Sequence, residues 1–74
     1  SADWASLITH EADRAILEHI TRHGSINEVE MNTLAGHSRG ARRFANRIDT
    51  YRPLLPFSVK PETPPTGKRY VKDT

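Results

Sequence analysis

The pattern of apolar and polar positions predicts three helices followed by two short strands in this 74-residue chain. The first helix follows Thr9, the expected N-cap, and ends at Gly24, which is typical of a C-terminal cap. Glu11 and Asp13 fall in its first turn, where negative charge favours the helix dipole. Its buried side is expected to consist of the apolar residues at helical spacing, Ile16, Leu17 and Ile20.

A second, shorter helix is predicted between Asn27 and Gly36. Asn27 and Glu30 have the spacing of a capping box, and Ile26 and Met31 have that of a hydrophobic staple. The segment Ser25-Ile26 before them is long enough to pair as an edge strand. The apolar side of this helix is expected to consist of Met31, Leu34 and Ala35.

The third helix, residues 38–51, has the clearest amphipathic pattern, with Ser38 as its expected N-cap. One apolar stripe is formed by Ala41, Phe44, Ile48 and Tyr51. The opposite side carries Arg39, Arg42, Arg43, Asn46 and Thr50, with Arg47 at the rim. Guanidinium groups suit phosphates and guanine edges, and an amide suits adenine, so this side has the chemistry of a DNA-binding surface. The alternative is a solvated charged face, which most charge runs form.

After Arg52-Pro53, which ends the third helix, the sequence predicts a β-hairpin. Residues 57–60 alternate between apolar and polar, and residues 68–72 are rich in strand-forming residues. Between them lies the loop PETPPTG, residues 61–67, whose prolines argue against regular structure. Such a short hairpin is expected to need support from the helices.

Residues 1–8 are expected to form an extension or short helix ahead of a domain that spans residues 9–74. Trp4, Leu7 and Ile8 have helical spacing. We favour a core position for Trp4, although Trp4 and Leu7 are also suitable anchors for a partner or for the remainder of a parent protein. The first residue is Ser1 rather than methionine, which suggests a piece excised from a larger protein or a processed terminus.

Composition narrows the possible classes of function. There is no cysteine, so disulfides and thiolate metal sites are excluded, and no apolar run is long enough to span a membrane. This fits the cytoplasm, at the nucleoid, or the nucleus. Residues 1–35 carry a net charge of −4 and residues 36–74 carry +6, so the second half has the charge expected for binding a polyanion.

An enzyme is not expected. The sequence lacks a Ser/His/Asp grouping, a phosphate-binding glycine loop and a cofactor motif, and a small chain encloses a substrate pocket with difficulty. His19 and His23 are four residues apart, but no third ligand lies at a spacing typical of a metal site, so no metal or other cofactor is expected.

The predicted order of elements resembles the winged helix-turn-helix family over residues 9–72. The segments that carry the resemblance are ILEHITRHGSI, NEVEMNTLAGHS, and the pair LPFSVK and GKRYVK. The resemblance implies an α+β, mostly α fold in which residues 38–51 enter the major groove of double-stranded DNA. The loop 61–67 would then approach the backbone or minor groove. Arg42 occupies a position that is usually apolar in the commonest pattern, which indicates a rotated or earlier-starting helix.

On this resemblance, Arg39, Arg43 and Asn46 are expected to face base edges. The residues expected to contact phosphates are Arg42, Arg47, Lys60, Lys68 and Arg69, with the Ser38 hydroxyl as a further contact. The alternative function is a protein–protein interaction module of a larger ATPase, transposase or regulator, because fold alone does not determine function.

Overall fold

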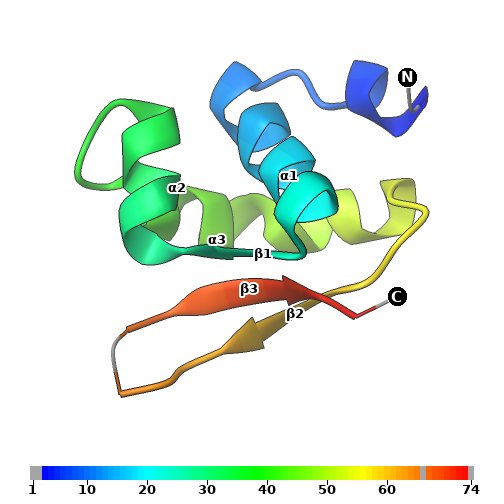
Figure 1. Cartoon of the computed structure of the whole chain (residues 1–74). Coiled ribbons are helices and arrows are strands. Elements are labelled where there is room, and N and C mark those ends of the chain that lie inside the picture. The colour runs from blue at the N-terminus through cyan, green and yellow to red at the C-terminus, as the bar shows by residue number, and fades with distance from the viewer. Residues whose placement is uncertain (1–2, 66, 74) are drawn as a thin grey trace.

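The computed structural model describes residues 3–65 and 67–73, and it shows an α+β, mostly α fold (Figure 1). Three α-helices and a three-stranded antiparallel sheet have the arrangement of a winged helix-turn-helix with a C-terminal hairpin wing. In chain order the elements are η1 Asp3–Leu7, α1 Glu11–His23, β1 Ser25–Asn27, α2 Glu28–Ala35, α3 Gly40–Tyr51, η2 Arg52–Leu54, β2 Val59–Glu62 and β3 Arg69–Lys72.

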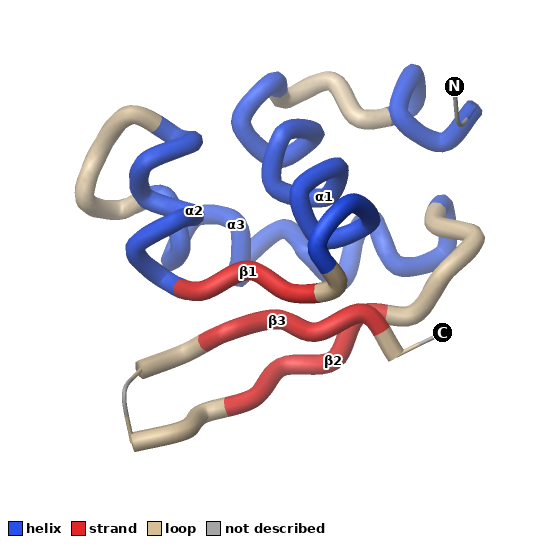
Figure 2. The backbone as a smooth tube through the Cα atoms, viewed as in Figure 1, coloured by secondary structure: helices blue, strands red, loops and turns tan. Residues whose placement is uncertain are grey.

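The sheet joins the predicted hairpin to the short segment between the first two helices. Its strand order is β1-β3-β2, with Ile26 opposite Tyr70 and Val59 opposite Lys72. Figure 2 shows the helices gathered on one side of the three strands, with the β2–β3 hairpin farthest from them. The hairpin therefore has the structural support that it was predicted to need. Thr66 of the predicted loop lies outside the described residues.

Aromatic contacts connect the helices to the hairpin. Phe44 of α3 is fully buried, and its ring meets that of Tyr70 edge-on with centroids 5.4 Å apart. Trp4 is also buried and meets Phe57 edge-on at 5.5 Å. The core position predicted for Trp4 is confirmed, so this side chain is not an exposed anchor. The buried apolar cluster consists of Trp4, Ile8, Ile16, Leu17, Ile20, Ile26, Met31, Phe44, Ile48, Tyr51, Val59 and Tyr70.

Local capping signals place most helix ends where they were predicted. Asn27 Oδ1 accepts from the Glu30 N–H at 2.8 Å, and Glu30 Oε1 accepts from the Asn27 N–H at 3.1 Å, which completes the capping box. Gly36 ends α2 with φ of 78°, a conformation that favours glycine. Gly24 ends α1 in the same way.

Two predicted helix starts are wrong. The N-cap of α1 is His10 rather than Thr9, and no side chain caps it. The N-cap of α3 is Arg39, so Ser38 belongs to the preceding turn. The reason lies in α2, where Asn32 Oδ1 accepts the Ala41 N–H at 2.8 Å. A residue from the neighbouring helix therefore supplies the cap that Ser38 was expected to provide.

Two further predictions need correction. Strand β2 continues through Pro61 and Glu62, which were assigned to the loop. Proline is tolerated there because β2 is an outer strand of the sheet, and Pro61 lies opposite Tyr70. Leu34 was placed on the buried side of the second helix, but it is 41% exposed because the short helix directs only Met31 fully into the core.

Gly40 permits the close approach of α2 and α3, which leads to a prediction. A Cβ at this position would lie 2.9 Å from the Met31 carbonyl oxygen and would overlap the Cβ of Ala35. We expect Gly40→Ala to destabilise the fold by about 1–3 kcal/mol through overpacking, although alanine is normally better than glycine in a helix. Urea unfolding followed by circular dichroism measures this change.

The control is Thr50→Ala, at an exposed position of the same helix. Its effect on the free energy of unfolding is expected to stay within about 0.5 kcal/mol. A Gly40→Ala protein as stable as the parent protein would show that α2 and α3 do not require this close approach.

Candidate nucleic-acid interface

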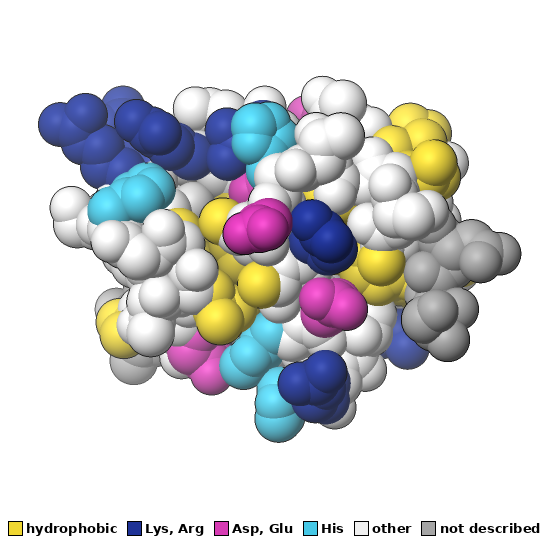
Figure 3. All heavy atoms as spheres, turned by 90° about the horizontal axis from the view of Figure 1, so that it is seen from above, with side chains coloured by type: hydrophobic (Ala, Val, Ile, Leu, Met, Phe, Trp, Pro, Cys, Tyr) yellow, Lys and Arg dark blue, Asp and Glu magenta, His cyan; other side chains and the backbone are white. Residues whose placement is uncertain are grey.

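The exposed side of α3 forms a basic face, defined here as Arg39, Arg42, Arg43 and Asn46. All four residues are exposed. Within the described part of the chain, the three guanidinium groups have no ion pair and no side-chain hydrogen bond. Seen from above, Lys and Arg side chains project together from one corner of the molecule (Figure 3). The predicted separation of the apolar and cationic sides of this helix is confirmed, with Phe44 and Ile48 buried on the other side.

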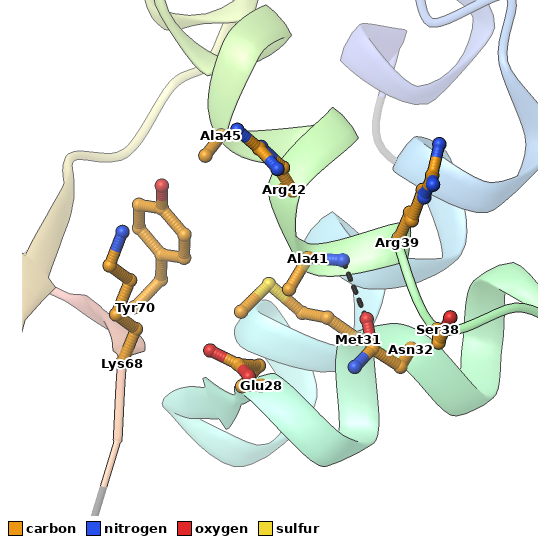
Figure 4. Close-up of a pocket in the computed structure, with 10 residues that line it drawn as sticks. All are labelled: Glu28, Met31, Asn32, Ser38, Arg39, Ala41, Arg42, Ala45, Lys68 and Tyr70. Carbon is orange, nitrogen blue, oxygen red and sulfur yellow. Dashed lines mark hydrogen bonds between the residues drawn. The ribbon is translucent and has the colours of Figure 1, made fainter.

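A groove of about 440 Å³ separates the basic face from the wing. Figure 4 shows Lys68 and Tyr70 on one side of it and Arg42 on α3 opposite them. Among the described residues that line it, Glu28 contributes the one carboxylate. These lining residues are Glu28, Met31, Asn32, Ser38, Arg39, Ala41, Arg42, Ala45, Lys68 and Tyr70. Cations from α3 and from the wing therefore border the same groove.

Arg47 is the first predicted site residue that the structure places elsewhere. Its Nε donates to Asp13 Oδ2 at 2.6 Å, and its Nη2 donates to Asp13 Oδ1 at 3.2 Å. The Tyr51 hydroxyl donates to the same carboxylate. Asp13 is 1% exposed, so this network lies between α1 and α3 rather than on the surface. Its hydrogen bonds with Asp13 raise the pKa of Arg47 above the usual value.

This network corrects one expectation and extends another. Arg47 was predicted to contact phosphate, but its guanidinium is already paired with a buried carboxylate. Asp13 lies in the first turn of α1 as predicted, and it is also the buried partner of two side chains of α3. A buried carboxylate requires such partners because an unpaired charge in a core is strongly unfavourable.

Arg69 is likewise paired within the fold. Its Nη2 lies 2.6 Å from Glu62 Oε1 and its Nε donates to the same oxygen at 2.7 Å, across the β2–β3 pairing. Arg69 is thus less available for phosphate than predicted. Lys60 and Lys68 are exposed and, within the described residues, unpaired, so they remain candidates for phosphate contacts on the wing.

Ser38 is exposed in the turn before α3 and lines the groove in Figure 4. The amino end of the helix is partly occupied, because Asn32 takes the Ala41 N–H. Asn32 was not identified from the sequence. Its partner is nine residues away, and no local motif marks such a distant cap.

The histidines form no metal centre in the described structure. His19 Nε2 lies 3.2 Å from Glu30 Oε2, and the His19 and His23 rings are 4.5 Å apart. No group of three or more metal-ligating side chains occurs within residues 3–65 and 67–73. No helix in this part of the chain has the length and apolar character needed to cross a membrane.

Breaking the buried network should destabilise the fold. Asp13→Asn removes the carboxylate charge, and we expect a loss of about 1–3 kcal/mol because the hydrogen bonds from Arg47 and Tyr51 to this buried side chain are weakened. Chemical denaturation followed by tryptophan fluorescence measures the loss. Asp49→Asn is the matched control, because its pair with Arg52 lies at the surface and Asp49 is 88% exposed. Equal effects of the two variants would contradict a structural role for Asp13.

Tyr51 should make stability depend on alkaline pH. Burial and the hydrogen bond to Asp13 raise its pKa to about 12. The folded state therefore holds this proton more tightly than the unfolded chain, and the resulting stability is complete below about pH 10 and is lost as pH rises toward about 12. Burial also raises the pKa of Tyr70.

We expect the free energy of unfolding to decrease by on the order of 2 kcal/mol from Tyr51 alone across this range. In Tyr51→Phe, the decrease should shrink to the part due to Tyr70, as measured by urea unfolding at several alkaline pH values. Ultraviolet titration of phenolate should lose its highest transition in the same variant. An unchanged titration curve would show that Tyr51 is not the perturbed group.

Comparison with known proteins identifies no relative of this chain. No family model matches it, and no match is found among curated proteins or solved structures. The candidate interface is therefore defined by the geometry and charge of its own side chains.

Proposed function

We propose that this chain is a duplex-DNA-binding module that inserts the basic face of α3 into the major groove. The hairpin would lie against the adjacent backbone or minor groove. Such a module acts where DNA is present, at the nucleoid or in the nucleus. The proposal rests on the winged helix-turn-helix arrangement and on how the fold uses its arginines.

The observation that carries the proposal is the division of the arginines in residues 36–74 into two groups. Arg47, Arg52 and Arg69 are paired with Asp13, Asp49 and Glu62. Arg39, Arg42 and Arg43 are adjacent, exposed and, within the described structure, unpaired. Like charges one turn apart, such as Arg39 and Arg43, destabilise a helix. A polyanion outside the molecule would supply the counter-charges that these three lack.

The side-chain types support specific roles. Arg39, Arg43 and Asn46 lie along the centre of the basic face and would meet base edges, with guanidinium directed to guanine and amide to adenine. Arg42, Lys60 and Lys68 would contact phosphates. The Ser38 hydroxyl would be a further phosphate contact at the start of α3.

The ion pairs of Arg47 and Arg69 lower the number of phosphate contacts, and hence the salt dependence of DNA affinity, that we expect. With Arg47 and Arg69 internally paired, five of the cations predicted to contact DNA remain unpaired within the described residues: Arg39, Arg42, Arg43, Lys60 and Lys68. Each phosphate contact contributes about −0.9 to the slope of log K against log salt on duplex DNA. A slope of about −4 to −5 is therefore expected.

The test is duplex affinity at several salt concentrations, measured by fluorescence anisotropy with a random-sequence duplex. We expect Arg39→Ala combined with Arg43→Ala to weaken binding by about 2–4 kcal/mol and to reduce the salt slope by about 2. The helical circular-dichroism signal should be unchanged because both side chains are exposed.

The charge-matched control combines Arg22→Ala with Lys72→Ala. These exposed cations lie at the end of α1 and the end of β3, outside the basic face. Net charge falls by the same amount in both double variants, so a loss confined to the first locates the interface. Equal losses would indicate nonspecific attraction, and salt-insensitive or absent binding by the parent protein would refute the proposal.

A further inference from the structure

One carboxylate lies in the cationic groove between the basic face and the wing. Glu28, the first residue of α2, lines this groove together with Arg39, Arg42 and Lys68. In Figure 4, Glu28 lies on the α2 side of the groove and Lys68 lies on the wing side. A negative charge at this position opposes the phosphate contacts that are proposed for the same groove.

The Glu28 side chain is exposed and has no fixed partner in the described structure. Within residues 3–65 and 67–73 it forms no side-chain hydrogen bond and no ion pair. Asp49 and Glu62, by contrast, each pair with an arginine. The charge of Glu28 is therefore not neutralised by a single neighbour, and it faces the cations that a phosphate would use.

The fold does not need the Glu28 carboxylate to cap α2. The capping box is formed by the side chains of Asn27 and Glu30. Glu28 contributes a first-turn charge that favours the helix dipole, which is a weak effect at an exposed position. Its carboxylate is therefore free to act on a ligand in the groove.

A backbone hydrogen bond fixes Glu28 beside the wing. The Glu28 N–H donates to the Lys68 carbonyl oxygen at 3.1 Å. The same two residues also line a second groove, of about 240 Å³, together with Pro64 and Gly67 of the wing loop. Glu28 and Lys68 are thus neighbours in space, and a phosphate bound to the Lys68 ammonium group would lie near the Glu28 carboxylate.

The carboxylate and a phosphate compete for the same cation. Two like unit charges a few ångströms apart in water weaken binding by about two- to fivefold, and salt screens this repulsion. The contribution of Lys68 to polyanion binding is therefore reduced while Glu28 is ionised. The amino end of a helix otherwise suits phosphate, and at α2 this negative side chain opposes such a contact.

We propose that Glu28 limits polyanion binding on the wing side of the groove, because it competes with phosphate for Lys68 and keeps a nucleic-acid backbone away from the amino end of α2. This role rests on the proposed DNA-binding function and adds to the same site a residue that lowers affinity. With the Lys68 contact suppressed, the slope of log K against log salt should lie nearer about −4 than about −5.

The test compares the parent protein with Glu28→Gln, Lys68→Ala and the double variant, using fluorescence anisotropy with a random-sequence duplex at several salt concentrations. We expect Glu28→Gln to tighten binding about threefold at low salt, to lose this gain as salt rises, and to steepen the salt slope by up to about 0.9. Lys68→Ala should weaken binding more in the Glu28→Gln background than in the parent protein, because the carboxylate no longer competes for the ammonium group.

The matched control is Glu11→Gln. Glu11 is exposed in the first turn of α1 and does not line the groove, so this variant removes the same charge from an equivalent helix position. Its gain in affinity should be much smaller, and the helical circular-dichroism signal should be kept in both glutamine variants. Equal gains for Glu11→Gln and Glu28→Gln, or equal losses for Lys68→Ala in the two backgrounds, would overturn the proposal.

Inorganic polyphosphate is the second probe, because it carries phosphate charge without bases or duplex geometry. If the parent protein binds polyphosphate but not duplex DNA, the DNA-binding proposal fails, while tighter polyphosphate binding by Glu28→Gln still supports the role of Glu28. Duplex binding that is the same in the parent protein and in Glu28→Gln would overturn the role of Glu28 alone. Absence of binding to both probes would overturn both proposals.

Discussion

The orientation of α3 depends on one buried carboxylate. Asp13 lies in the first turn of α1, yet it binds Arg47 and Tyr51 of α3, which are 34 and 38 residues farther along the chain. A carboxylate that is 1% exposed must keep such partners, because its unpaired charge in the core is strongly unfavourable. The network holds Tyr51 and Arg47, at the rim of the exposed side, against α1. Arg39, Arg42 and Arg43 stay exposed. The Asp13 network therefore helps to set the rotation of α3 that exposes the basic face.

A second constraint sets the position of the amino end of the same helix. Gly40 brings α3 against α2, and Asn32 of α2 accepts the Ala41 N–H. The turn thus starts α3 one residue later than the sequence predicted, with the Arg39 and Ser38 side chains placed beside the groove. The positions of the proposed DNA contacts follow from packing between helices rather than from the third helix alone.

Some features of the fold are determined by residues that are close together in the sequence. Gly24, Gly36 and the Asn27–Glu30 box act within a few residues, so the ends of α1 and α2 could be predicted. The apolar stripe of α3 is equally local, and Phe44 and Ile48 are buried as expected.

Distant pairing was not predictable from these patterns. The helical wheel placed Arg47 at the rim of the cationic side, but it could not reveal its partner Asp13, which is 34 residues away. Glu62 and Arg69 face each other only once the hairpin has formed. The sequence thus located the cationic helix, whereas only the fold distinguishes its free arginines from its paired ones.

Pro61 has a consequence for how the wing behaves in a crowded solution. It lies in β2, one of the two outer strands, where exposed backbone donors would allow another chain to add a strand. Proline has no N–H to offer, and the neighbouring Lys60 adds a charge that opposes stacking of like edges. Pro61 and Lys60 therefore make this edge of the sheet a poor template for an added strand, while the hairpin stays exposed.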